Sequence, residues 1–121
     1  MPYSTYLKNR LLNCLRNNSG AIAAVYASLH TASPGDNGAN EVAGGAPAYA
    51  RKQMTWNAPA GGTMDGDSVT FDVPAGTTVT HVGFWDAAAA GNFLGYADVT
   101  DEAFVGQGTY TLTDADLDLN S

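Results

Sequence analysis

Short apolar runs that alternate with polar residues, each closed by a turn signal, recur along this chain at roughly ten-residue spacing. Residues 68–73 place three apolar side chains on one side of an extended segment, and residues 77–85 show a similar alternation. A Pro-Ala-Gly turn at 74–76 joins these two segments. Because residues two apart share one face of a β-strand, this pattern predicts many short, half-buried strands.

The predicted strands together define the fold class. Residues 68–73 and 77–85 are interpreted as a β-hairpin. Seven or so short strands predict a mainly β fold, an antiparallel β-sandwich or jelly-roll-like domain. The chain has 121 residues, the length of one domain, so we expect a single β-sandwich domain over residues 21–121. The expected strands are 21–30, 48–57, 68–73, 77–85, 93–99, 103–113 and 115–119.

An N-terminal helix over residues 4–17 is predicted outside these strands. Ser4 is a suitable N-cap, and apolar residues recur at i, i+4, i+7 and i+8 from Leu7. Polar residues and a glycine at 17–20 then end the helix. Two interpretations stay open for this segment, 1–20: an amphipathic helix that caps one end of the β core, or an arm that docks on a partner. The candidate docking residues are Leu7, Lys8, Arg10, Leu11 and Arg16.

A long loop follows the first expected strand. Residues 31–47 contain Pro-Gly, Asn-Gly and Gly-Gly pairs, which is more turn signal than a hairpin needs. Loops of this length in small domains are usually functional or mobile. We therefore expect a contact loop, with Gly35, Asn37 and Gly38 as candidate docking residues.

The charge is unevenly distributed along the chain. Residues 1–35 carry three basic side chains and no acidic one, whereas residues 53–121 carry ten acidic side chains and no basic one. A body without lysine or arginine cannot neutralise phosphates, so we expect no binding to nucleic acid or to anionic membranes. Its partner should be basic, a cation, or another protein. Residues 1–20 lack an apolar run of seven or more, so no signal peptide is expected.

The residues that could support chemistry are few and scattered. Cys14 stands alone, which excludes an internal disulfide and a cysteine-based zinc site. A zinc site on His30 and His81 would need a converging carboxylate, and no nucleophile motif is present. The acidic segments 65–67 and 114–120 lack the pattern of an EF-hand, leaving weak calcium binding or a charge-protected strand edge open. We predict no enzyme, no metal site and no cofactor.

The aromatic residues allow two interpretations. They either fill the core of a small sandwich or form a platform that stacks on sugars. The alternative glycan platform would rest on Trp56 and Trp85, supported by Tyr49, Phe93 and Tyr96.

Five segments of the chain form a recognisable pattern: residues 4–13, 27–42, 47–51, 79–88 and 91–94. Together they resemble a family of short structural proteins of tailed bacteriophages, commonly labelled tail fibre or minor capsid proteins. The resemblance covers nearly the whole chain in the same order. It implies a virion component, assembled in the host cytoplasm, without catalytic residues or a cofactor.

Within the virion we expect a capsid decoration or cementing protein, because the chain shows no heptads or repeats from which to build a fibre shaft. The alternative is a tail fibre or baseplate protein that binds a host receptor or glycan. Expected partners are the major capsid protein or other virion proteins. We also expect a homo-oligomer, for which a trimer would suit threefold positions on an icosahedral shell.

Overall fold

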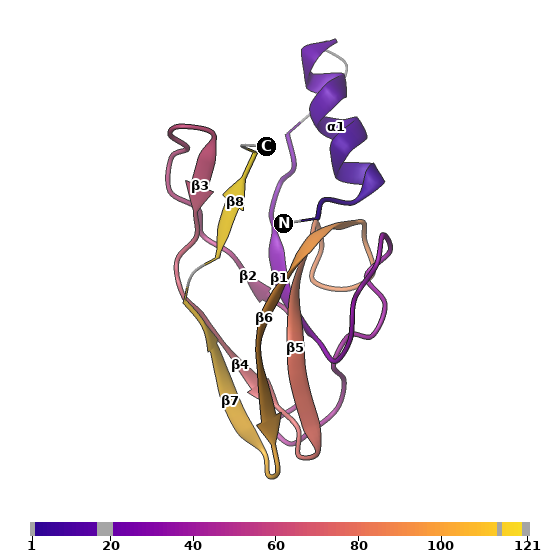
Figure 1. Cartoon of the computed structure of the whole chain (residues 1–121), viewed down its shortest axis with the longest axis vertical. Coiled ribbons are helices and arrows are strands. Elements are labelled where there is room, and N and C mark those ends of the chain that lie inside the picture. The colour runs from indigo at the N-terminus through magenta and orange to yellow at the C-terminus, as the bar shows by residue number, and fades with distance from the viewer. Residues whose placement is uncertain (1, 17–20, 114, 120–121) are drawn as a thin grey trace.

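The computed structural model describes residues 2–16, 21–113 and 115–119. In this part of the chain one helix is followed by strands that run to the C-terminal end (Figure 1). No helix there is long and apolar enough to cross a membrane. The elements are α1 (Thr5–Leu15), β1 (Tyr26–His30), β2 (Lys52–Gln53), β3 (Thr63–Asp65), β4 (Val69–Val73), β5 (Thr77–Trp85), β6 (Phe93–Phe104), β7 (Gly108–Leu112) and β8 (Asp116–Asp118).

The strands form one larger sheet and two short ribbons. The larger sheet has the order β2-β1-β5-β6, and every pair in it is antiparallel. One ribbon pairs β4 with β7, and we call it the β4–β7 ribbon. The other, the β3–β8 ribbon, pairs residues 63–65 with residues 116–118. The ribbons lie beside the larger sheet (Figure 1), and the fold is mainly β and sandwich-like, as the alternating pattern predicts.

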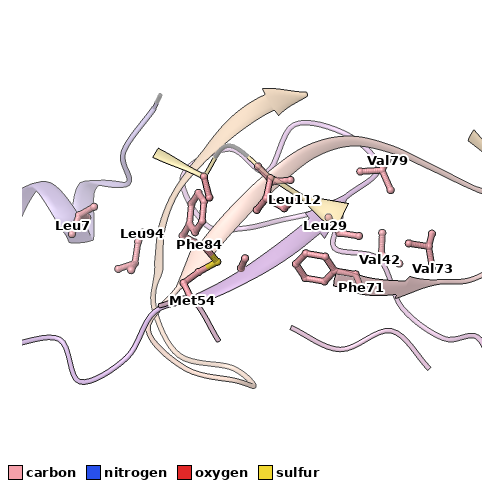
Figure 2. Close-up of a cluster of buried hydrophobic side chains, with 13 residues drawn as sticks. Leu7, Leu29, Val42, Met54, Phe71, Val73, Val79, Phe84, Leu94 and Leu112 are labelled. Atoms are coloured by element: carbon pink, nitrogen blue, oxygen red, sulfur yellow. The ribbon is translucent and has the colours of Figure 1, made fainter. Parts of the chain in front are cut away.

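The core lies between the larger sheet and the β4–β7 ribbon. Phe71 and Val73 of β4 and Leu29 of β1 are fully buried (Figure 2). Val82 of β5 belongs to the same core cluster.

Val79 and Val82 of β5 both belong to the core cluster. The pairing of β5 with β6 shifts register between Val79, opposite Glu102, and His81, opposite Asp98, so the extra residues lie on β6. Extra residues of this kind form a β-bulge, which bends the strand that carries them.

The outer face of the larger sheet is covered as well. Ser28 and His30 alternate with the core residues of β1 and yet are fully buried. The loop that follows β1 lies over them, and the His30 ring bonds the Ala39 carbonyl through Nδ1 at 2.8 Å. β1 is therefore buried on both faces, which explains its run of small and apolar residues.

The sequence predictions are wrong in part about strand pairing and about strand extent; β6, for example, continues to Phe104 where a strand over 93–99 was expected. β4 and β5 do not form a hairpin: β4 pairs with β7, whereas β5 pairs with β1 and β6. The turn at 74–76 carries the chain from one layer to the other, and its Gly76 N–H donates to the Phe104 carbonyl at 2.7 Å. Residues 48–57 are strand only at β2. Beside it, the Tyr49 hydroxyl donates to Glu41 and Arg51 Nη1 donates to the Ala87 carbonyl, so both side chains hold neighbouring loops.

Candidate interaction surface

Helix α1 is fixed to the β body by its first turn. The Ser4 hydroxyl caps the helix by accepting from the Leu7 N–H at 3.1 Å, and it donates to the Phe93 carbonyl. The Ser4 N–H donates to the Leu94 carbonyl at 2.8 Å, which joins the chain just before the helix to β6. Capping and pairing with β6 therefore set the direction in which α1 leaves the body.

The later turns of α1 extend away from the body. Leu7 is buried, but Leu11 is 40% exposed, Leu12 60% and Leu15 85%. Cys14 is also exposed. The apolar stripe predicted for this helix therefore meets the core only at its start, and its C-terminal half presents leucines on the surface. Exposed apolar side chains that gather in this way commonly mark an interaction site.

An open apolar groove lies between α1 and the β3–β8 ribbon. We call it the α1 groove; its volume is about 400 Å³. Figure 1 places α1, β3 and β8 at the same end of the molecule. The buried indole N–H of Trp56, a lining residue, has no hydrogen-bond partner in the described chain. The lining residues are Tyr3, Leu7, Leu11, Ile22, Val25, Trp56, Pro59, Gly62, Thr63, Met64, Phe84, Leu94, Leu117 and Leu119.

The helix and the loop that carry the predicted docking residues are joined at one point, by residues that were not themselves predicted. The Thr5 N–H at the start of α1 donates to Asp36 Oδ1 at 2.8 Å. Lys8 and Arg16 are exposed on α1, and Arg10 lies over the Tyr6 ring.

Within the loop, Gly35 and Asn37 are exposed whereas Gly38 is buried. A Cβ on Gly38 would lie 2.3 Å from Trp85 Cζ2, so this glycine lets the loop pack directly on the indole.

Arg51 holds the loops around Trp85 in place. Its Nε and Nη2 groups donate to the two Glu41 oxygens at 3.0 and 2.9 Å, and Nη1 donates to the Ala87 and Ala90 carbonyls at 3.0 and 2.8 Å. The guanidinium also lies 3.7 Å from the Trp85 ring centroid. Burial alone would raise the pKa of Glu41, but hydrogen bonds from Arg51 and Tyr49 outweigh it and hold this pKa below its usual value.

The two tryptophans do not form one platform. Trp56 packs near Phe84, with ring centroids 6.0 Å apart. Trp85 directly follows Phe84 in β5, so its side chain lies on the opposite face of the sheet from Phe84. Trp85 is 7% exposed and donates its N–H to Ser28 Oγ at 2.9 Å. The supporting aromatics are divided in the same way, since Phe93 packs on Trp85 and Tyr49 stacks on Phe71 in the core.

The two histidines meet, although they are far apart in the sequence. His30 and His81 are directly opposed across β1 and β5. Their ring nitrogens are engaged: those of His30 by Ser28 and Ala39, and those of His81 by Thr80 and Asp98. Sequence spacing could not reveal this pairing.

The acidic segments 65–67 and 114–120 meet where Asp65 opposes Asp116 in the β3–β8 ribbon; Asp114 and Asn120 lie outside the described residues. Among the residues that are described, no group of three His, Cys, Asp or Glu side chains could hold a metal ion.

A small, loop-rich β fold with an open apolar groove beside its helix has the features of a structural or interaction module. The family model described as podophage GP4 fiber I protein gp80 matches residues 2–119, so the chain belongs to this family. The resemblance to structural proteins of tailed phages is thereby confirmed, and the chain is a phage structural protein located in the virion. No curated protein matches the chain.

Proposed function

We propose that this protein is a component of a tail fibre and is attached to the tail through the α1 end of the molecule. The observation that carries the proposal is the match to a fibre protein family over residues 2–119. This description supports the tail fibre alternative better than capsid decoration, the role that we expected from the sequence.

The contact chemistry supports attachment through the α1 end. Leu11 and Leu15 are exposed beside the α1 groove, and Lys8 and Arg16 add positive charge to the same helix. Apolar side chains supply the free energy of association, and charges mainly supply orientation and association rate. The attachment partner is therefore a virion protein with an apolar patch flanked by acidic residues.

Host contact through the predicted glycan platform gains no support from the geometry. A stacking platform needs an aromatic face open to solvent, and the Trp85 ring is covered by Arg51 and by the loop at Gly38. The proposal is therefore restricted to a structural role in the fibre, with the loops around Trp85 held rigid.

The test is complementation of a phage that lacks this protein. The variant Leu11→Asp/Leu15→Asp places charge at the exposed leucines of α1 and leaves the buried core unchanged. The control is Val105→Asp, because Val105 is 95% exposed in the β6–β7 turn at the other end of the molecule. Cryo-electron microscopy and gel densitometry then measure location and copy number. We expect density on the tail at a few to a few dozen copies, lost in the double variant and retained in the control.

Density spread over the head at a fixed ratio to the major capsid protein would refute the fibre role and support decoration. Normal incorporation of the double variant would refute attachment through the α1 end.

A further inference from the structure

A row of buried polar side chains lies on the outer face of the larger sheet, beneath the loop that follows β1. Ser28 and His30 of β1 have none of their surface exposed, and the indole N–H of Trp85 is buried beside them. Residues 31–40 lie directly over this row, since a Cβ on Gly38 would come within 2.3 Å of the indole. We call residues 31–40 the cover loop.

The hydrogen bonds of this row require a neutral His30 ring. The Ala39 carbonyl of the cover loop can only accept, so the ring carries its proton on Nδ1, which donates to this carbonyl at 2.8 Å. Nε2 is then an acceptor, and the Ser28 hydroxyl donates to it at 2.7 Å. Ser28 Oγ in turn accepts from the Trp85 indole N–H at 2.9 Å. Every donor in the row has an acceptor in this arrangement, which fixes the tautomer of the ring.

A second proton on the ring has no partner while the cover loop is closed. Nε2 would become a donor, so the Ser28 hydroxyl would lose the acceptor for its own hydrogen. The ring is also packed closely on β5, because a Cβ on Gly83 would lie 2.7 Å from Nε2, which leaves no room for water there. A buried charge without hydrogen-bonded partners or water is costly. The doubly protonated ring therefore needs water, which the cover loop keeps out.

The charged and titratable groups around His30 do not offset this cost. Burial is the largest effect, and it lowers the pKa of His30. His81, directly opposite on β5, and Arg51 act in the same direction. The Ala39 carbonyl and Glu41 act against it. Because Arg51 binds the Glu41 carboxylate at 2.9 Å, the charge of that carboxylate is largely compensated.

The cover loop is built as one unit. Its two ends meet, since the Thr31 N–H donates to the Asn40 carbonyl at 3.0 Å. Inside the loop, the N–H groups of Gly38 and Ala39 both donate to the Pro34 carbonyl, at 3.1 and 2.9 Å. A compact loop with adjoining ends can move as a body about its base without unfolding the sheet below it.

Few polar contacts hold the cover loop to the rest of the protein. Apart from the histidine bond, its side chains make two such connections among the described residues: Asp36 accepts from the first backbone N–H of α1 at 2.8 Å, and the Ser33 hydroxyl lies 3.5 Å from that of Tyr96. The base is fixed separately, because Arg51 holds Glu41, the next residue of the chain. The loop can therefore lift while its base stays in place.

We propose that the cover loop lifts from the sheet when His30 is protonated, and that this movement uncovers the Trp85 indole. The proposal concerns the β body and does not depend on attachment through the α1 end. Near neutral pH the uncharged ring and the closed loop stabilise each other. In acid, the open form supplies the water that the imidazolium needs, so proton binding shifts the population toward the open form.

Hydrogen exchange of the Trp85 indole N–H reports this opening, because its bond to Ser28 lies beneath the cover loop. The experiment follows this exchange by NMR in the intact chain from about pH 7.5 to about pH 5, above the isoelectric point near 4.3. We expect the protection factor of the indole to be constant above about pH 6.5 and to fall about tenfold per pH unit below it, because only the open form takes up the proton.

Global unfolding would also expose the indole, so a core amide serves as the reference. The Val82 N–H lies in β5, between β1 and β6, and exchanges only when the larger sheet opens. The protection factor of the indole should be lower than that of the Val82 amide by about tenfold or more. Low concentrations of urea should accelerate exchange of the Val82 amide and leave that of the indole nearly unchanged, because lifting a loop exposes little surface.

Two variants identify the group that triggers the opening. His30→Gln removes the titrating ring and should abolish the pH dependence of indole protection. His81→Gln is the matched control and should keep it, because His81 is the other histidine of the chain and is bound by Thr80 and Asp98 at 2.7 and 2.6 Å. Circular dichroism establishes that both variants fold. Should His30→Gln not fold, the control alone assigns the dependence, since His30 is then the one histidine left.

Indole protection that does not change with pH would overturn the inference. A pH dependence that persists in His30→Gln, or that disappears in His81→Gln, would do the same, because another group would then be the trigger. Equal protection and equal urea dependence of the indole and the Val82 amide would also overturn it, since the cover loop would then open only when the whole protein unfolds.

Discussion

Replacing Arg51 by methionine is the most informative single change in the β body. The substitution keeps a long apolar side chain but removes the charge that neutralises Glu41 and the donors to the Ala87 and Ala90 carbonyls. The Arg51 side chain is 8% exposed and that of Glu41 is 22% exposed, so solvent replaces little of what is lost. Breaking a buried ion pair by removing one partner typically destabilises a protein by about 3–5 kcal/mol.

We therefore expect Arg51→Met to lower the free energy of unfolding by about 3 kcal/mol, the lower end of that range because Glu41 keeps its bond from Tyr49 at 2.8 Å. The assay is urea unfolding followed by tryptophan fluorescence. Lys52→Met is the matched control, since it removes the same charge from the half-buried neighbour, and it should cost less than about 1 kcal/mol.

The pH dependence gives a second, independent readout. In the wild type the pKa of Glu41 is below its unfolded value, so its contribution to stability is present at neutral pH and is lost as the pH falls through the folded pKa. Without Arg51, burial dominates and raises the pKa of Glu41. The deficit of Arg51→Met should therefore shrink as the pH falls from the raised pKa of Glu41 in the variant to its lowered pKa in the wild type. A loss under 1 kcal/mol at neutral pH, or a deficit independent of pH, would refute this account of the loops.

Three further changes test other contacts. Gly38→Ala should lower the free energy of unfolding by about 2–4 kcal/mol, because its Cβ would lie 2.3 Å from Trp85 and its φ is +79°. Gly35→Ala, at a φ of +64° with nothing within 4 Å of the Cβ, should cost about 1 kcal/mol, and equal losses would contradict direct packing of the loop on the indole. Burial lowers the pKa of His30, so the free energy of unfolding should fall as the pH drops below about 6.5, where the unfolded chain takes up the proton. In urea unfolding at a series of pH values, His30→Gln should reduce this pH dependence, and an unchanged dependence would exclude His30 as its source. Phe71→Ala should cost about 3–5 kcal/mol, because Phe71 is fully buried in the core, and a midpoint near wild type in the same assay would place the core elsewhere.

The sequence predicted element types better than element partners. Ser4 and the spacing from Leu7 identified α1 to within two residues of its ends, because capping and periodicity are local properties. The alternation in β4 and β5 identified both strands but not their partners, since alternation records which face is buried and not what covers it. The prediction that β4 and β5 form a hairpin was wrong for that reason.

The sequence indicated the helix beside the α1 groove but not the groove itself. The basic residues and the apolar spacing of α1 can be read from the sequence, and their docking role stays a prediction. The groove, in contrast, depends on Met64 and Leu117, which come from segments about fifty positions apart. Trp85 was expected either in the core or on a platform, and it lies under a loop on the far face of the sheet. A side chain that is buried under a loop leaves little periodic pattern in the sequence. Gly38, a glycine within a turn signal, was the local indication that the loop approaches Trp85 closely.

The pairing of β3 with β8 also has a consequence for how the protein is made. Residues 63–65 have no ladder partner until residues 116–118 emerge from the ribosome, and β4 waits similarly for β7. Pairings between distant segments form slowly, because the intervening chain loses entropy before the contact is made. The side chains of Met64 and Phe71 therefore lack their ladder partners until the ribosome has delivered β8 and β7. The yield of folded protein in an infected cell should depend on how slowly these segments aggregate relative to the rate at which the ribosome delivers their partners.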